Sequence, residues 1–293
     1  MENGRRYRGH KEEFPWPNDD DALMSYSSLN TAWARVLEPR GQDLVSAPVV
    51  LHKGTKVLDC GARGTTWMYD IEEKYPGTRI AVVDPGLEGD WPFTARQAFH
   101  FIRGFALGGM IVDYDGLYRN AYKHLLLGGW FEVRDHDLQF FVDTPSGDAD
   151  GNGKKEDTGG EEKAQELVVL RRWEKLVAKA AEKLGKQINM GAKHKEIMEK
   201  AGFVDVHEEV IKVPYGKWME GRAWEKAGSA YLMHMRHDTK AFIEELKAEI
   251  PESKLVSLRL YSLFRVVYGK KPKGASRKPE QAAREPGDVG EAA

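Results

Sequence analysis

Apolar and polar residues along the chain follow two periods, that of a buried strand and that of an amphipathic helix. Short apolar runs at 56–58, 79–83 and 99–102 are rich in β-branched and aromatic residues, which is typical of strands. Between the first two runs, apolar residues from Trp67 to Ile71 recur at helical spacing until a Pro-Gly pair. The order strand, helix, strand predicts a βαβ unit, and therefore an α/β fold with a mostly parallel sheet and helices on both faces.

The same patterns continue beyond this unit. A helix is expected at 115–126, followed by a strand at 128–133 after a glycine turn. An amphipathic helix is expected at 167–184, because apolar residues recur there every three or four positions and a glycine follows. The predicted series ends with a strand at 201–206, a helix that ends at 250 and a strand at 263–268.

The chain divides into a lid segment, one α/β domain and a tail. Residues 1–50 carry charges, prolines and an Asn-Asp-Asp-Asp cluster that predicts the start of a helix, so this segment is expected to form an N-terminal helical lid. Residues 51–272 are expected to form the α/β domain. Within it, residues 143–165 are mostly Gly, Asp, Lys and Glu, which predicts a disordered insert loop. The polar residues 273–293 predict a disordered tail.

The composition excludes some classes of partner. With 44 Lys and Arg against 46 Asp and Glu, the formal net charge is −2, which gives no reason to expect nucleic-acid binding. No apolar run approaches the roughly 18 residues that a membrane span requires. The chain starts without the apolar segment of a signal peptide, so a cytoplasmic location is expected, with a nuclear one as the alternative. The single cysteine, Cys60, is expected to be a small buried residue rather than a nucleophile.

A turn with two glycines follows the first predicted strand. Asp59, Gly61 and Gly64 belong to this turn, and Asp84 ends the second strand about 20 positions later, which is the layout that places a ribose against a carboxylate. We expect these four residues to contact a nucleotide-type cofactor. Arg63 stands where a further glycine is typical, and a side chain there takes volume from the ligand. Its guanidinium could bind a substrate carboxylate, pair with Asp84 or Asp59, or lie solvated across the pocket mouth.

Charged residues also follow the predicted strand at 128–133. Arg134, Asp135, His136 and Asp137 come directly after it, and ligands of open α/β sheets bind beyond the carboxyl ends of strands. A histidine between two carboxylates can be held in one tautomer and act as an acid or base near neutral pH. One histidine and two aspartates in consecutive positions do not form a closed metal site, so no metal is predicted. A hydrogen-bonded start of a loop is the structural alternative.

Aromatic residues are the third feature, with eight tryptophans in the chain. Trp67, Tyr215 and Trp218 belong to segments expected near the pocket, and aromatic walls there would suit a large apolar ligand. The alternative is that most of these rings belong to the core. His234 and His237 are three positions apart on a predicted helix, which indicates a polar helix face more than a metal site because no third ligand is evident.

Short motifs spread over nearly the whole chain resemble the fungal LaeA-like methyltransferases. The resemblance is carried by residues 2–7, 17–19, 57–61, 106–109, 121–125, 128–130, 201–204 and 266–272. It implies a Rossmann-like class I methyltransferase fold, S-adenosylmethionine (SAM) as the ancestral cofactor and a role in secondary metabolism.

Three departures from the family pattern lie in the cofactor half of the chain. Arg63 replaces a glycine of the family's turn, over which the methionine end of SAM passes in the family. Only 14 residues, 85–98, separate Asp84 from the next strand, too few for two helices and a strand, so the third strand is expected to be missing or shortened. A family Phe-Asp-Phe-Ile-His pattern has His100 in place of the carboxylate and Arg103 in place of the histidine. A degenerate cofactor site is therefore expected.

Three functions are compatible with these features. The first is an enzyme of secondary metabolism that works without SAM and catalyses a cyclisation or isomerisation of a hydrophobic small molecule, such as a pericyclic reaction of the Diels-Alder type. Such chemistry needs donors that polarise a carbonyl in a dry, shaped cavity. Its candidate catalytic residues are Arg63, His100, His136 and Asp137, and its expected pocket residues are Trp67, Arg103, Asp135, Tyr215 and Trp218. The alternatives are a SAM-dependent methyltransferase of small molecules and a noncatalytic regulator that binds a protein partner through the lid.

Overall fold

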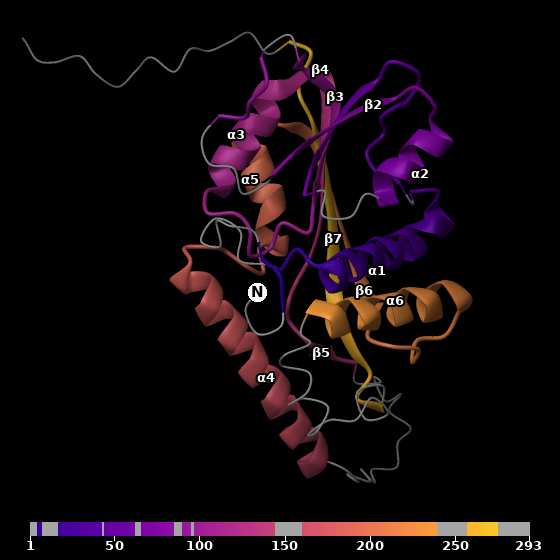
Figure 1. The fold of residues 1–293 in the computed structure, drawn as a ribbon, viewed down its shortest axis with the longest axis vertical. Helices are drawn as coiled ribbons and strands as arrows, with labels where there is room; N and C mark the ends of the chain where they lie inside the picture. The colour runs from indigo at the N-terminus through magenta and orange to yellow at the C-terminus, as the bar shows by residue number, and fades with distance from the viewer. Residues whose placement is uncertain are drawn as a thin grey trace, which may run out of the picture.

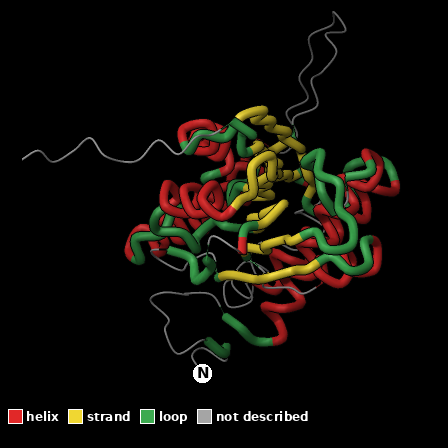
Figure 2. The backbone as a smooth tube through the Cα atoms, turned by 90° about the horizontal axis from the view of Figure 1, so that it is seen from above, coloured by secondary structure: helices red, strands yellow, loops and turns green. Residues whose placement is uncertain are grey.

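The computed structural model describes residues 5–7, 17–42, 44–61, 66–84, 90–94, 97–143, 160–238 and 257–274. Within these residues strands alternate with helices, as predicted, and helices cover both faces of one sheet (Figures 1 and 2). The strands are β1 (Lys56–Cys60), β2 (Arg79–Val83), β3 (Phe99–Phe105), β4 (Leu125–His136), β5 (Phe141–Val142), β6 (Val204–Pro214) and β7 (Leu260–Lys270).

The sheet is parallel on one side and antiparallel on the other. Its strands follow the order β2-β1-β3-β4-β7-β5, and β6 also pairs with β7. The first four strands are parallel to one another, whereas β7 is antiparallel to β4, β5 and β6. The chain runs from β1 outward to β2 and then returns to the other side of β1 as β3. The strand order therefore reverses at β1, and ligands of open α/β sheets bind beyond the carboxyl ends of strands at such a point.

Helices from different parts of the chain cover the two faces. α3 and α5 pack on one face, and α1, α2 and α6 lie on the other (Figure 1). The helices are α1 (Asp20–Leu37), α2 (Thr66–Lys74), α3 (Tyr114–His124), α4 (Gly160–Lys183), α5 (His194–Lys200) and α6 (Arg222–Asp238), with short 3-10 turns η1 (Glu38–Arg40) and η3 (Gly191–Lys193). None of the described helices is long and apolar enough to cross a lipid bilayer.

The predicted N-terminal helix is present as α1. It begins after Asp19, whose carboxylate accepts a hydrogen bond from the backbone N–H of Ala22 at 3.0 Å and pairs with Arg5 at 2.6 Å. On its inner face Trp33 is buried, and the centroid of its ring lies 4.5 Å from that of Phe264 on β7. α1 also packs along α6. The helix therefore belongs to the hydrophobic core, and its role as a lid stays a prediction.

The sheet ends at β2 among the described residues. Residues 90–94 and 97–98, which lie between β2 and β3, contain no strand. Instead the ring of Trp91 stacks on His124 of α3, and Phe93 packs edge-on against Phe99 at the start of β3. The third strand that the family fold carries is thus missing from this part of the described chain, as the short interval predicted, because a parallel crossover takes a dozen or more residues.

Only the two ends of the predicted insert loop at 143–165 fall within the described residues. Asp143 forms ion pairs with Lys212 and Arg259, so two cations hold its carboxylate next to the sheet. At the other end α4 already begins at Gly160. Residues 144–159 and 275–293, and the helix predicted to end at 250, lie outside the described residues. The predicted limits of the lid and of the domain stay predictions.

Candidate functional site

Four charged side chains lie together where β1, β3 and β4 approach their carboxyl ends. Asp59 is the register partner of Arg103, and Arg103 is the register partner of Glu132. Arg134 lies two residues further along β4, so its side chain points to the same face as that of Glu132. Arg103 Nη1 lies 3.3 Å from Asp59 Oδ1, and Arg134 Nε lies 2.7 Å from Glu132 Oε1. All four residues are buried, so each charge depends on its partner.

The guanidinium of Arg103 is held from several sides. Its centre lies 4.4 Å from the centroid of the Trp67 ring and 4.1 Å from that of Phe105. Its Nη2 atom donates a hydrogen bond to Asn30 Oδ1 of α1 at 3.0 Å. Burial lowers the pKa of Arg103 to about 10, and burial also raises the pKa of Asp59, against the opposing pull of Arg103. The site therefore contains a fixed cation at neutral pH.

The second ion pair, between Arg134 and Glu132, anchors residues of the connection between α1 and β1 to the sheet. Glu132 Oε2 accepts hydrogen bonds from the backbone N–H groups of Ser46 and Ala47, both at 2.7 Å. Arg134 Nη2 donates to the carbonyl oxygen of Gln42 at 2.9 Å. Because a buried carboxylate and a buried guanidinium both find backbone partners in 42–47, this connection is fixed over the strand ends.

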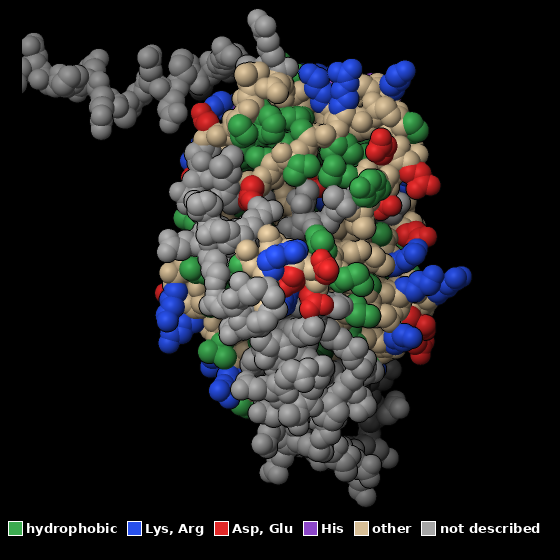
Figure 3. All heavy atoms as spheres, viewed as in Figure 1, with side chains coloured by type: hydrophobic (Ala, Val, Ile, Leu, Met, Phe, Trp, Pro, Cys, Tyr) green, Lys and Arg blue, Asp and Glu red, His purple; other side chains and the backbone are tan. Residues whose placement is uncertain are grey.

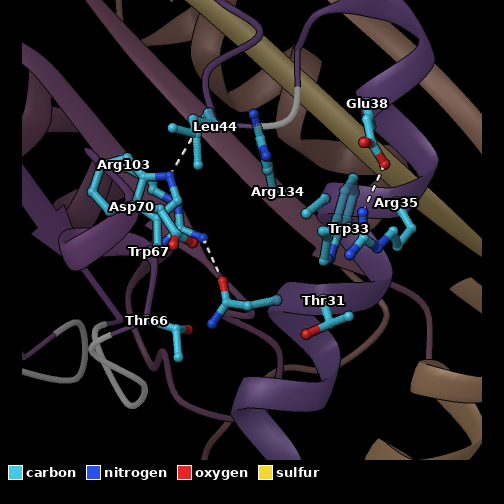
Figure 4. A pocket seen from close by; sticks show the side chains of 12 residues that line it. Thr31, Trp33, Arg35, Glu38, Leu44, Thr66, Trp67, Asp70, Arg103 and Arg134 are labelled. Carbon is cyan, nitrogen blue, oxygen red and sulfur yellow. Dashed lines mark hydrogen bonds and ion pairs between the residues drawn. The ribbon is translucent and has the colours of Figure 1, made fainter. Parts of the chain in front are cut away.

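A cavity of about 240 Å³ lies beside these charges, between α1, α2 and the sheet. Arg103, Arg134, Trp67 and Thr66 line it from the sheet and α2, and Trp33 lines it from α1. Figure 4 shows Arg103 and Trp67 on one side of the space, Thr31 and Trp33 of α1 on the other, and Arg134 between them. Trp67 and Arg103, both predicted as pocket residues, line this cavity, and their contact with a substrate stays a prediction.

A second hollow of about 510 Å³ lies between α1 and α6. Met24 and Met233 flank it and are both exposed. Thr31 and Arg35 line both hollows, so α1 borders each of them. Hydrophobic side chains also reach the surface among the charged ones on the molecular face that carries α1 and α6 (Figure 3).

The predicted cofactor residues fall partly within the described chain. Gly61 has a φ of +107°, and a Cβ atom there would lie 2.4 Å from the carbonyl oxygen of Phe105, so only glycine fits. Asp84 follows the end of β2 and is half-buried. Asp59 is engaged by Arg103, which takes the role that one alternative gave to Arg63. Arg63 and Gly64 lie outside the described residues. The preceding Cys60 is buried, and burial raises the pKa of its thiol, as expected for a structural cysteine.

The three residues at the end of β4 have separate partners. Asp135 Oδ2 lies 3.0 Å from Nε2 of His194 on α5, whose Nδ1 lies 2.9 Å from the hydroxyl of Tyr118. Asp137 follows His136 in the chain, and its Oδ2 lies 3.6 Å from Arg265 Nε. Burial raises the pKa of Asp137, with Arg265 opposing this effect.

Both carboxylates are therefore engaged by residues other than the His136 ring. That ring packs instead among Tyr231, Phe264 and His234. Successive side chains of a strand point to opposite faces, which separates Asp135 from the ring of His136. The roles of Asp135, His136 and Asp137 in catalysis stay predictions.

Other predicted residues lie away from the cavity. His100 lies near the amino end of β3, where its Nδ1 accepts a hydrogen bond from the backbone N–H of Lys56. The structure therefore does not bring His100 to the cavity near the carboxyl ends of the strands, and its catalytic role stays a prediction. Tyr215 is buried and donates a hydrogen bond to the hydroxyl of Tyr231, and Trp218 Nε1 donates to the carbonyl oxygen of Leu260. Neither lines the two hollows described above.

Sequence reasoning missed Asn30 and Glu132, whereas it placed Arg134 at the mouth of the pocket without giving it a catalytic or binding role. Glu132 and Arg134 did leave a signal, because they are two charged residues on one face of an otherwise apolar strand. Asn30 left none. In the described part of the chain, no three His, Cys, Asp or Glu side chains gather as a metal site would require.

Comparisons with known proteins agree with the geometry. No family model matches the chain. It is 24% identical over 267 residues to the methyltransferase pytC of Aspergillus terreus, which covers 85% of this chain and 75% of that protein. It is 26% identical to the secondary metabolism regulator laeA of Aspergillus fumigatus, covering 75% and 58% of the two chains.

Among solved structures, the cyclopropane synthase MmaA2 of Mycobacterium tuberculosis aligns with a TM-score of 0.42 at 13% identity, over 84% of each chain. The strand order, with β7 inserted antiparallel beside β4, is that of the fold expected from the sequence motifs. Over most of its length the chain is thus similar to the fungal laeA and pytC proteins, and it has the α/β methyltransferase-like fold that the sequence motifs predicted.

Proposed function

We propose that this protein is an enzyme of fungal secondary metabolism that transfers a methyl group from SAM to a hydrophobic small molecule. The observation that carries the proposal is the position of Gly61 and Asp84, which directly follow the paired strands β1 and β2 at their carboxyl ends. A nucleotide-type cofactor of an open α/β sheet binds beyond such strand ends, with a glycine turn after the first strand and a carboxylate after the second. The name of the relative pytC supports the same activity.

The residues present fit the adenosine side of SAM. Asp84 would accept hydrogen bonds from the ribose hydroxyls, and the bare backbone at Gly61 would allow the cofactor to approach the turn. When bound, SAM supplies an activated methyl group on a sulfonium ion. Asp59 neutralises the nearby cation of Arg103, so the positively charged sulfonium would not be repelled by an unpaired positive charge.

The two hollows on either side of α1 support a hydrophobic substrate. The inner one has the aromatic walls of Trp33 and Trp67, and the outer one is flanked by Met24 and Met233, whose flexible side chains adapt to irregular apolar shapes. A molecule larger than the inner cavity of about 240 Å³ would extend past Thr31 and Arg35 toward the outer hollow. A cytoplasmic location and a protein partner stay predictions.

A second candidate is SAM-independent cyclisation or isomerisation of such a molecule. The observation that favours it is Arg103, a buried cation where the family has a histidine, together with the edge position of β2 among the described strands. A fixed guanidinium could polarise a carbonyl group in a shaped cavity, and a shorter sheet offers less wall for an adenine ring.

Binding of S-adenosylhomocysteine (SAH), measured by titration calorimetry, tests the cofactor. We expect micromolar affinity and a loss of about tenfold or more in Asp84→Ala, because that carboxylate would lose its hydrogen bonds to the ribose. Asp115→Ala is the matched control, since this carboxylate of α3 forms an exposed ion pair with Lys200 of α5. Absence of binding at millimolar SAH would contradict the proposal.

The products distinguish the remaining functions. The pure protein is incubated with late apolar intermediates of its host's secondary metabolism, with and without SAM, and the products are analysed by mass spectrometry. A gain of one methyl group that requires SAM supports methyl transfer. A product of unchanged mass formed without SAM supports the second candidate, and no product in either arm supports a noncatalytic regulator.

A further inference from the structure

Three buried polar atoms around the inner cavity lack a hydrogen-bond partner among the described residues. They are Nε of Arg103, Nε1 of Trp33 and Oγ1 of Thr66, and all three residues line the same cavity. Arg103 and Trp33 are each only 1% exposed, so bulk water does not reach these groups. Buried donors are normally satisfied, so three such groups around one space form a place where the acceptor of a ligand would fit.

The chemistry of these atoms restricts the ligand. The N–H groups of Arg103 and Trp33 can only donate, so the ligand must present an acceptor to them. The arginines that line the cavity have carboxylate partners: Asp59 for Arg103, Glu132 for Arg134 and Glu38 for Arg35. A cavity whose charges are already balanced favours an oxygen that is neutral, or that carries a delocalised negative charge, over a compact dianion such as phosphate.

We propose that the inner cavity binds the carbonyl or enolate oxygen of the substrate, and that the substrates are enolisable carbonyl compounds. This deepens the proposed function and rests on it. The donors are preorganised, because Asp59, Asn30 and the rings of Trp67 and Phe105 hold the Arg103 guanidinium. The apolar walls of Trp33, Trp67 and Leu44 would contact the carbon frame around that oxygen.

Indole N–H signals of the protein labelled with ¹⁵N-tryptophan test this proposal by NMR. The probes are cyclohexanone, a neutral carbonyl, and 1,3-cyclohexanedione, an enolate at neutral pH, with cyclohexane as the probe without an acceptor. We expect both oxygen probes to shift the Trp33 signal, which Trp33→Phe assigns by removing it. The Trp91 signal is the matched control, because its Nε1 is also buried without a partner among the described residues but Trp91 does not line the cavity.

Variants of the donors test the role of Arg103. Arg103→Lys keeps the charge but removes the Nε donor and the flat stacking surface, so we expect the probe affinity, read from the Trp33 signal, to fall about tenfold. Should this variant not fold, Thr66→Val removes one donor at nearly constant volume, and we expect a loss of roughly threefold. Equal affinity in every folded variant, or no shift of the Trp33 signal by either oxygen probe, would overturn the proposal.

The acceptor oxygen has a second possible source, the methionine carboxylate of the cofactor. SAH and 5′-methylthioadenosine, which lacks the amino-acid part, separate the two. We expect neither to displace cyclohexanedione. Displacement by SAH alone would assign the cavity to the cofactor carboxylate and overturn the substrate proposal. The probes are added without SAM, so their binding does not depend on the cofactor. If SAH did not bind to the protein at all, methyl transfer would be contradicted, but the binding of the oxygen probes near Trp33 would still stand.

Discussion

Removal of Arg103 is the sharpest test of how the site is held together. In Arg103→Met the carboxylate of Asp59 loses its ion pair in a place where neither residue is more than 1% exposed. The variant also loses the hydrogen bond to Asn30 and the contacts with two aromatic rings. Breaking a buried pair by removing one partner costs about 3–5 kcal/mol of unfolding free energy, and we expect a loss in this range at pH 7.

The loss of unfolding free energy in Arg103→Met should depend on pH, and the protonation of Asp59 decides whether it grows or shrinks as the pH rises. Burial raises the pKa of Asp59 in the folded protein, and Arg103 opposes that effect, so its removal raises the pKa further. The folded variant then binds a proton that the unfolded chain releases above about pH 4. The stability that this proton confers is fully present below the pKa of Asp59 in the unfolded chain. It is lost as the pH rises toward the higher pKa that Asp59 has in the folded variant. The cost of Arg103→Met should therefore be larger at pH 8 than at pH 5.

Urea denaturation followed by far-UV circular dichroism at both pH values measures these effects. The double variant Asp59→Asn/Arg103→Met removes both charges, and we expect its cost to be at least about 2 kcal/mol smaller than the sum of the two single variants. Additive costs would refute the reasoning. So would a single-variant loss below about 1 kcal/mol, or equal losses at pH 5 and pH 8.

Three further predictions concern the surrounding frame. Gly61→Ala should lower the unfolding free energy by more than about 2 kcal/mol, since its Cβ would meet a carbonyl oxygen, whereas Gly41→Ala, with open space around it, should cost only about 1 kcal/mol in the same denaturation assay. Glu132→Gln should speed hydrogen exchange at the Ser46 amide, because a neutral amide accepts that hydrogen bond less strongly; unchanged exchange would count against the proposed anchoring. Asp19→Ala should cost about 1 kcal/mol at pH 7, and the difference from the unmodified protein should shrink as the pH falls below about 4, because Arg5 lowers the pKa of this N-cap carboxylate; a pH-independent difference would show that only the neutral cap matters.

Local patterns in the sequence were sufficient for most of the fold. The spacing of apolar residues located the main strands and the N-terminal helix, since burial of one face or stripe leaves a period that is visible without the partner. The short interval between Asp84 and Phe99 also predicted that the third strand would be missing, because chain length alone limits what a crossover can contain. Trp67 was a pocket candidate because of its aromatic ring and Arg103 because it departs from the family pattern, and both line the inner cavity.

The partners of the charged residues were decided only by the tertiary structure. Asp59 and Arg103 are 44 positions apart, and their contact depends on the parallel register of β1 with β3. His100 and Arg103 are close in sequence, yet their side chains lie toward opposite ends of the sheet, because each residue of a strand advances the chain by about 3.3 Å. Asn30 enters the site from α1, whose docking against the sheet follows from packing of its buried face.

The sequence by itself therefore determined which elements form and which residue types the site contains. The tertiary structure decided which charges neutralise one another and which buried donors lack a partner among the described residues. The physical reason is that periodicity is a local property of the chain, whereas a buried ion pair or an unsatisfied donor is defined by atoms that only strand register and helix packing bring together.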